Sequence, residues 1–250
     1  MNPACPTSNP VYPPRTIATP GVAEDSENGP RGAAGCRNRR EDFDMYARSI
    51  TFLAGPGTID EGIAFVNDEA MPAVTAMDGC IGVSMICDRE SGCCIITSAW
   101  SSEDAMTSSE PKLQLMRDRG AKIFGAEPSI DRWEITVVHR HAMSGEGACV
   151  RCSWFSMDPA GLSDAVGTYR MAVLPALEEM DGFCSASLMV DRATGHAVSS
   201  VTFASRDDLV TSRPAAEALR TRIADELGAT VTDIREFELA LAHLHVPEMA

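Results

Sequence analysis

The chain has 250 residues, of which 44% are hydrophobic and 23% are charged, and its net charge is −15. This length accommodates two domains, each with its own core, and the composition is that of a globular protein. The negative charge argues against a nucleic-acid partner, because binding to a phosphate backbone requires a basic surface. No apolar run approaches the ~18 residues of a membrane span, and no signal peptide is recognisable. We therefore expect a cytoplasmic protein without a membrane partner.

The first 44 residues differ in composition from the rest. They contain seven of the 15 prolines, little apolar content and no periodicity, which predicts a disordered N-terminal leader over residues 1–44. A second interpretation is that translation begins at Met45, immediately before the first predicted strand.

An internal repeat dominates the remainder of the chain. Residues 48–126 match residues 151–229 without a gap at an offset of 103 positions, and 18 of the 56 residues from 71 to 126 are identical to their partners. Whole motifs coincide: Met77-Asp78-Gly79 with Met180-Asp181-Gly182, and Asp88-Arg89 with Asp191-Arg192. Identity in register over whole motifs predicts a tandem duplication.

In the first repeat, residues 46–53 have the pattern of a short strand. Apolar residues at steps of three and four predict a helix over residues 59–77, which Pro72 should kink or divide. The apolar runs 80–87 and 93–100 predict a β-hairpin around Gly92. Ser102 is a candidate N-cap for the next helix, and Pro111 suits its first turn or that of a second segment. The last strand is predicted at residues 129–141, with one face formed by Trp133, Ile135, Val137 and His139.

The second repeat has the same order of elements. Strands are predicted at residues 149–156, 183–190, 196–203 and 233–245, and residues 143–147 form a linker. We therefore assign a first α+β repeat to residues 45–142 and a second to residues 148–246. Each reads β-α-β-β-α-β, the ferredoxin-like unit, whose sheet has helices on one face only. Packing of the two uncovered faces would give a pseudo-dimeric α+β barrel within one chain, and hence a monomer.

Two motifs carry a resemblance to a known family. Asp78-Gly79 precedes the second strand, and Trp100-Ser101-Ser102-Glu103-Asp104-Ala105 closes the third strand and opens a helix. With the element order, these make residues 45–246 resemble a tandem form of the antibiotic-biosynthesis-monooxygenase (ABM) type of the dimeric α+β barrel superfamily. The resemblance implies a pocket between helices and sheet in each unit. Known members include cofactor-independent monooxygenases of polycyclic phenols or quinols and haem-degrading enzymes.

One departure from the family concerns cofactors. Active or haem-binding members often have a histidine early in the helix that follows the Trp-x-Ser segment, whereas residues 105–109 and 208–212 contain none. Haem ligation is therefore not expected there, and we predict a protein without a cofactor.

Repeat-matched arginines and histidines are the candidate catalytic residues. Arg48 and Arg151 in the first strands could hold an oxyanion or a phenolate; the alternative is a structural ion pair with a carboxylate such as Glu134 or Glu238. His139 and His243 could serve as a pocket acid or base. Their H-x-H spacing, with His141 and His245, also suits a metal. No Asp, Glu or Cys recurs beside both pairs to complete a ligand set, so no metal is predicted.

The candidate substrate-binding residues are also matched between repeats. Trp100 and Phe203 could line the pockets, although a large aromatic residue at a strand end is usually part of a core. Ser109 and Ser212 could contact a substrate, but no base is visible in the sequence to activate either as a nucleophile. Solvated helix faces are expected for the remaining matched arginines, which are Arg117, Arg119, Arg220 and Arg222.

The nine cysteines suggest neither a disulfide framework nor a zinc site. The count is odd, and none of the seven in the repeats has a cysteine at its matching position, so reduced, mostly buried thiols are expected. Cys149-x-x-Cys152 lies in a predicted strand, where this spacing places the two thiols on opposite faces. A redox motif is therefore not favoured.

Two functions remain open. In the first, the chain is a cofactor-independent monooxygenase acting on an apolar aromatic molecule of the phenol or quinol type. In the second, it is a non-catalytic protein that binds a small apolar ligand, or a stress-type protein, on the same fold.

Overall fold

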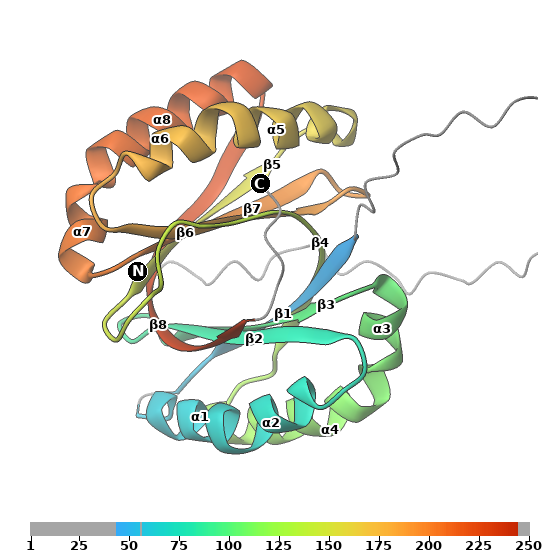
Figure 1. Cartoon of the computed structure of the whole chain (residues 1–250). Coiled ribbons are helices and arrows are strands. Elements are labelled where there is room, and N and C mark those ends of the chain that lie inside the picture. The colour runs from blue at the N-terminus through green and yellow to red at the C-terminus, as the bar shows by residue number, and fades with distance from the viewer. Residues whose placement is uncertain (1–43, 56, 245–250) are drawn as a thin grey trace, which may run out of the picture.

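The computed structural model describes residues 44–55 and 57–244, so the predicted leader and His245 lie outside the described residues. Eight strands form a closed barrel in the order β1-β3-β2-β8-β5-β7-β6-β4, and every neighbouring pair is antiparallel. The helices of the two repeats cover opposite outer faces of this barrel (Figure 1). The α+β barrel expected from the duplicated pattern is confirmed.

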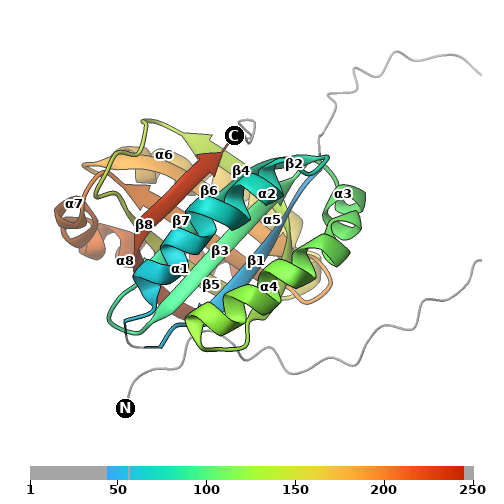
Figure 2. The ribbon, with the colours of Figure 1, turned by 90° about the horizontal axis from the view of Figure 1, so that it is seen from below.

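The first repeat follows the predicted order closely. Its strands are β1 (Met45–Leu53), β2 (Cys80–Asp88), β3 (Cys93–Trp100) and β4 (Ser129–Arg140), and its helices are α1 (Ile59–Phe65), α2 (Met71–Thr75), α3 (Glu103–Ser108) and α4 (Glu110–Phe124). The Ser102 hydroxyl accepts a hydrogen bond from the amide of Ala105 at 3.1 Å, so Ser102 caps α3 as expected. Seen from below, α1, α2 and α4 run across the outer face of this sheet (Figure 2).

The second repeat reproduces this arrangement. Its strands are β5 (Cys149–Ser156), β6 (Phe183–Asp191), β7 (His196–Phe203) and β8 (Thr230–Leu244), and its α-helices are α5 (Leu162–Thr168), α6 (Leu174–Glu178), α7 (Arg206–Thr211) and α8 (Arg213–Leu227). A short 3₁₀ turn, Pro159–Gly161, precedes α5. None of the helices in the described part of the chain is both long and apolar enough to cross a membrane.

A π-helical turn divides the first long helix of each repeat. The turn spans Val66–Ala70 in the first repeat and Tyr169–Val173 in the second, and α2 and α6 follow with Pro72 and Pro175 in their first turns. A proline inside a regular α-helix removes a hydrogen bond and clashes with the preceding turn, and a widened turn relieves that clash. The division predicted from Pro72 is therefore observed in both repeats.

The two sheets join at two seams. Strand β2 pairs with β8, and β4 pairs with β6, so the outer strands of one repeat bond to those of the other. Matched ion pairs reinforce both seams: Arg89 contacts Glu238 at 2.8 Å, and Arg192 contacts Glu134 at 2.5 Å. Each arginine follows a hairpin strand of one repeat and reaches the last strand of the other. The repeated Asp-Arg motif thus has a structural role between the repeats.

The barrel interior and the two helix-covered faces hold the hydrophobic core. A β-bulge between Ile135 and Val137 changes the side on which β4 residues face. Consequently Trp133 and Ile135 pack with residues of both repeats inside the barrel, whereas Val137 packs with the helix layer of the second repeat. The prediction that Trp133, Ile135, Val137 and His139 share one face was wrong, because an extra residue in a strand reverses the alternation.

The cysteines are mostly as expected. Six in the described part of the chain are free thiols, but Cys93 is disulfide-bonded, which corrects the expectation of reduced thiols at that position. Cys149 packs in the helix layer and Cys152 in the barrel interior, so the two lie on opposite faces of β5. Burial raises the pKa of Cys149, and it raises that of Cys152 to about 12. Neither thiol has the low pKa of a redox-active cysteine.

The closed barrel leads us to expect a monomer. Both edges of each sheet are already paired with the other repeat, so no edge strand is left to recruit a second chain. Sedimentation equilibrium should give a mass near the 26.7 kDa of one chain. A mass near twice that value would contradict this expectation and would require an interface outside the barrel.

Candidate functional site

The first matched arginine forms a fully buried cluster with two other predicted residues. Arg48 donates to the Ser109 hydroxyl at 2.9 Å and to the Met106 carbonyl oxygen at 2.6 Å, and its guanidinium lies 5.9 Å from the centre of the Trp100 ring. A carboxylate oxygen of Glu110 is 2.8 Å away. The arginine thus fixes the junction between α3 and α4 to β1.

The second arginine repeats this cluster with a different carboxylate. Arg151 donates to the Ser212 hydroxyl at 3.0 Å and to the Leu209 carbonyl oxygen at 2.6 Å, and it lies 5.5 Å from the centre of the Phe203 ring. Its ion-pair partner is Glu236 on β8, at 3.1 Å. Burial alone would raise the pKa of Glu236, but its hydrogen bonds and charge interactions with Arg213 and Arg151 outweigh burial and lower it.

Both clusters correct the expected ion pairs. Glu134 and Glu238 pair with Arg192 and Arg89 instead, as described above. The charges around the two clusters are exchanged: Glu110 on the helix faces Arg132 on the strand in one, and Arg213 on the helix faces Glu236 on the strand in the other. Each buried guanidinium therefore has a carboxylate partner: Arg48 pairs with Glu110 on α4, and Arg151 pairs with Glu236 on β8. The structure joins Arg48 with Ser109 and Trp100, and Arg151 with Ser212 and Phe203, as packing and helix-junction residues.

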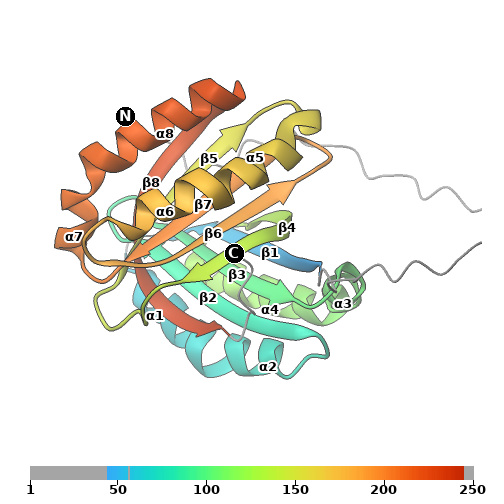
Figure 3. The ribbon, with the colours of Figure 1, turned by 45° about the horizontal axis from the view of Figure 1, so that its top comes forward.

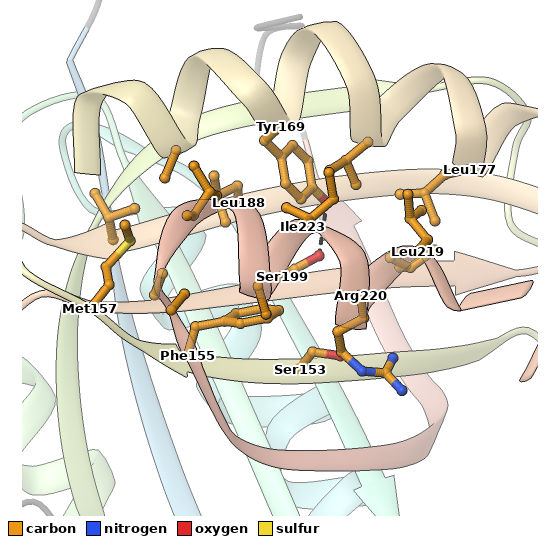
Figure 4. A pocket seen from close by; sticks show the side chains of 18 of the residues that line it. Ser153, Phe155, Met157, Tyr169, Leu177, Leu188, Ser199, Leu219, Arg220 and Ile223 are labelled. Carbon is orange, nitrogen blue, oxygen red and sulfur yellow. Dashed lines mark hydrogen bonds between the residues drawn. The ribbon is translucent and has the colours of Figure 1, made fainter. Parts of the chain in front are cut away.

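A cavity of about 100 Å³ lies between the sheet and the helices of the second repeat. Apolar side chains from α5, α6, α8 and the sheet form most of its wall, with Met157 and Phe155 towards one end and Arg220 with Ser153 towards the other (Figure 4). Arg151 also lines it, whereas Phe203 and Ser212 do not. A cavity here agrees with the pocket position that the family resemblance implies.

Two polar groups lie within this apolar wall. The hydroxyls of Tyr169 and Ser199 are 2.8 Å apart and form a hydrogen bond across the cavity (Figure 4). Burial raises the pKa of Tyr169 to about 12, so the phenol stays neutral at physiological pH. Tyr169 is the first residue of the π-helical turn, and such turns often occur at functional sites.

Arg220 is the cation of the cavity that lacks a carboxylate. Burial and the neighbouring charge of Arg151 lower its pKa and outweigh the opposite effect of the carboxylates of Glu217 and Glu236, yet an arginine remains protonated in proteins. Within the described residues, no carboxylate oxygen lies within 4.0 Å of its guanidinium. Its counterpart in the first repeat, Arg117, is only 4% exposed and pairs with Glu110 at 2.5 Å. Arg220 therefore offers an uncommitted positive charge at the end of an apolar cavity.

The corresponding space in the first repeat is filled. Phe52 and Phe124 stack there with ring centres 4.5 Å apart and are both buried. The stack requires glycine on the neighbouring helices: a Cβ atom on Gly62 would overlap the Phe124 ring, and one on Gly120 would lie 3.1 Å from Phe52. At the matching positions the second repeat has Ala165, Ile223 and Leu227, all of which line its cavity.

The predicted histidines lie away from this cavity. His139 is near the end of β4, where its Nε2 atom is 2.5 Å from a carboxylate oxygen of Glu178. His243 is exposed on β8, opposite Val83 of β2. A separate cavity of about 580 Å³ lies inside the barrel, and residues of both repeats, His139 and His141 included, line it.

Sequence reasoning missed three residues of the cavity. The expectation of solvated helix faces is wrong for Arg117, which is buried, and for Arg220, which is half-buried. Arg119 and Arg222 are exposed as expected. Tyr169 and Ser199 were not singled out because their counterparts are Val66 and Ile96. That difference was itself a signal, since a polar pair replaces an apolar pair at equivalent core positions.

The chain is similar in sequence to two proteins of Mycobacterium tuberculosis. It is 48% identical over 220 residues to the uncharacterized protein Rv2557 of Mycobacterium tuberculosis, covering 87% of this chain and 98% of that protein. It is 50% identical over 206 residues to the uncharacterized protein Rv2558 of the same organism, covering 82% and 87%. No protein-family model matches the chain.

Solved structures share the fold at low sequence identity. A candidate monooxygenase from Fusobacterium nucleatum superposes with a TM-score of 0.60 at 11% identity, covering 81% of this chain and 95% of that one. An anthrone oxidase-like protein gives a TM-score of 0.58 at 13% identity, covering 84% and 96%. A candidate monooxygenase from Lactobacillus acidophilus also gives 0.58, at 9% identity, with 81% and 97% covered. These likenesses show the fold alone.

The different packing of the two repeats can be tested with one substitution in each. Gly62→Ala places a methyl group against the buried Phe124 ring, and we expect it to lower the free energy of unfolding by about 1–3 kcal/mol. Gly167→Ala adds the same group to the matching helix, α5, where nothing lies within 4 Å, and should be neutral or stabilising by up to about 1 kcal/mol. Urea unfolding measures both. Equal effects would contradict the filled packing of the first repeat.

Proposed function

Because the chain belongs to the family of the M. tuberculosis proteins Rv2557 and Rv2558 and has a tandem-duplicated ABM-type barrel, we propose that its second repeat binds a small phenol-type molecule. The single observation that carries this proposal is the cavity with an apolar wall and the uncommitted Arg220 at its end. The first repeat supports the fold and has its equivalent space filled by Phe52 and Phe124.

The size of the cavity favours a single ring. An apolar cavity of about 150 Å³ accepts benzene, and the cavity here is about 100 Å³. A monocyclic phenol would need small side-chain movements, whereas a polycyclic molecule would require displacement of several wall residues. Met157 at one end is the most adaptable of these, since methionine has three rotatable bonds.

The polar groups of the cavity suit a molecule with one acidic oxygen. A nearby positive charge stabilises a phenolate and lowers the pKa of the bound phenol, and Arg220 supplies that charge without breaking an existing ion pair. Tyr169 and Ser199 offer a hydroxyl pair that can exchange its mutual hydrogen bond for one to the ligand. The remainder of the wall contributes burial of apolar surface, the main source of affinity for such a ligand.

Binding is the function best supported because the predicted arginines are already engaged in structural contacts and the predicted histidine His139 does not line the cavity. Arg48 and Arg151 hold helix junctions through hydrogen bonds and ion pairs, and His139 lies outside the cavity. Among the described residues that line the cavity, Tyr169 is the one candidate general base, and its raised pKa keeps the phenol protonated at neutral pH, so it cannot accept a proton.

The proposal is tested by calorimetric titration with phenol and with benzene. We expect the wild type to bind phenol more tightly than benzene, and Arg220→Gln to remove most of that difference, weakening phenol by about tenfold or more because a charged hydrogen bond is lost. Arg222→Gln, on the exposed face of the same helix, is the matched control and should bind as the wild type. Equal phenol affinity for wild type and Arg220→Gln would count against the assignment of Arg220.

A filled variant locates the binding site. Ala165→Gly, Ile223→Gly and Leu227→Phe together copy the packing of the first repeat into the second. This variant should lose binding of both phenol and benzene while keeping a folded circular dichroism spectrum. Retained binding in a folded filled variant would place the ligand elsewhere, for example in the barrel cavity.

A second candidate function is cofactor-independent monooxygenation in the same cavity. The fold neighbours include candidate monooxygenases, and Arg220 would hold the electron-rich phenolate that can react with oxygen. In such a reaction a phenol becomes a quinone, with one atom of O₂ forming the new carbonyl and the other leaving as water. The substrate itself supplies the electrons, and exclusion of water protects the intermediate.

Oxygen consumption separates the two candidates. For monooxygenation, the wild type in EDTA and without flavin should consume oxygen with phenols or quinols, and ¹⁸O₂ should label the product. The filled variant and Arg220→Gln should lose this activity, whereas Arg222→Gln should keep it. Tight phenol binding without oxygen consumption would leave binding as the function.

A further inference from the structure

Three potential metal ligands meet at the seam between the repeats. They are His139 at the end of β4, His141 just after it, and Glu178 at the end of α6, and one ligand atom of each lies within 4.8 Å of the others. We propose that these residues bind a divalent transition-metal ion of the zinc class. The inference concerns a different place from the cavity of the second repeat and does not depend on the proposed function.

The donor set matches the ligands that such ions prefer. Two imidazoles and one carboxylate form the protein ligands of many zinc sites that keep a further position open for water. Hard ions such as Mg²⁺ and Ca²⁺ prefer oxygen ligands, so two imidazoles favour zinc and its neighbours in the first transition series. His141 and Glu178 are exposed, which lets the ion enter and leaves room for water to complete its coordination.

The present distances are close to those of a bound site. Nitrogen and oxygen ligands at about 2.0–2.1 Å from tetrahedral zinc lie roughly 3.3 Å apart. The Nε2 atom of His139 and a carboxylate oxygen of Glu178 are 2.5 Å apart, a close contact between two potential ligand atoms. Zinc bound between the two atoms would need to separate them by less than an ångström from their present distance.

The surrounding structure holds both imidazoles in place. Strands β4 and β6 run side by side (Figure 3). In their ladder His139 lies opposite Ala186, and the backbone amide of His141 donates to the Cys184 carbonyl oxygen at 2.8 Å. Phe183 packs against both rings, with centre distances of 6.3 and 6.0 Å. The backbone of both histidines is therefore positioned by the ladder and the adjoining hydrogen bond before a metal binds.

The pseudo-symmetric position provides a natural control. His243 occupies on β8 the place of His139 on β4, since it lies opposite Val83 as His139 lies opposite Ala186. The counterpart of Glu178 at the offset of 103 residues is Thr75, which has no carboxylate. Among the described residues, this donor set therefore occurs at one seam only.

Titration of the full chain with Zn²⁺, followed by calorimetry, tests the proposal. The wild type should bind one equivalent with saturation, and its melting temperature should rise with zinc, because the ion links the two repeats and binds only the folded state. His141→Ala and Glu178→Thr should weaken binding by at least tenfold, and His243→Ala should not. Since His141 and Glu178 are exposed, both variants should fold, as their melting temperatures in EDTA will show.

Binding through thiols must be distinguished from this site, because the chain has free cysteines. Co²⁺ is the probe: coordination by nitrogen and oxygen gives visible d–d bands alone, whereas thiolate ligands add an intense near-ultraviolet charge-transfer band. The expected result is d–d bands that disappear in Glu178→Thr. A thiolate band, equal zinc affinity in wild type and Glu178→Thr, or no saturable binding by the wild type would overturn the proposal.

Discussion

Pairing of strands between the repeats is the constraint on which the rest of the structure depends. A single ferredoxin-like sheet has one apolar face without helices and two edges with unpaired backbone groups. Both features are unfavourable when exposed to water. The β2–β8 and β4–β6 ladders close both edges and bury the uncovered faces against each other in one step. The ion pairs Arg89–Glu238 and Arg192–Glu134 cross the same seams, so the motif that most clearly marks the duplication in the sequence also joins its two halves.

The two helix layers outside the barrel differ in their buried ion pairs. Each layer keeps the buried arginine that ties the helix junction to its first strand, but the carboxylate comes from α4 in one repeat and from β8 in the other. The exchange of Glu110 and Arg132 for Arg213 and Glu236 preserves neutrality, because a buried charge without a partner is costly. One consequence is that Arg117 is neutralised by Glu110 while Arg220 is not. The charge of Arg220, on which the proposed binding site depends, thus lacks a carboxylate partner within the described part of the chain because the structural ion pair differs between the two repeats.

Aromatic packing produces the second difference between the layers. In the first repeat Gly62 and Gly120 leave room for the stacked Phe52 and Phe124, and a close-packed interior results. In the second repeat Ala165 and Ile223 stand at these helix positions and Leu227 in place of Phe124, and a cavity remains, which holds the Tyr169–Ser199 hydrogen bond. The helix layer of the first repeat is therefore closely packed, whereas that of the second contains a cavity.

The sequence by itself determined the duplication, the order of the elements and the barrel, because hydrophobic periodicity, turn residues and the repeat offset are local or in-register signals. It also identified Arg48, Ser109 and Trp100 as matched positions, which the structure joins in one cluster. Only the tertiary structure decided their partners, since the ion pairs to Glu110 and Glu236 depend on which strand and helix end meet in space. The bulge in β4, the burial of Arg117 and the approach of Glu178 to His139 arise in the same way, from contacts between residues far apart in the chain, which no periodic pattern records.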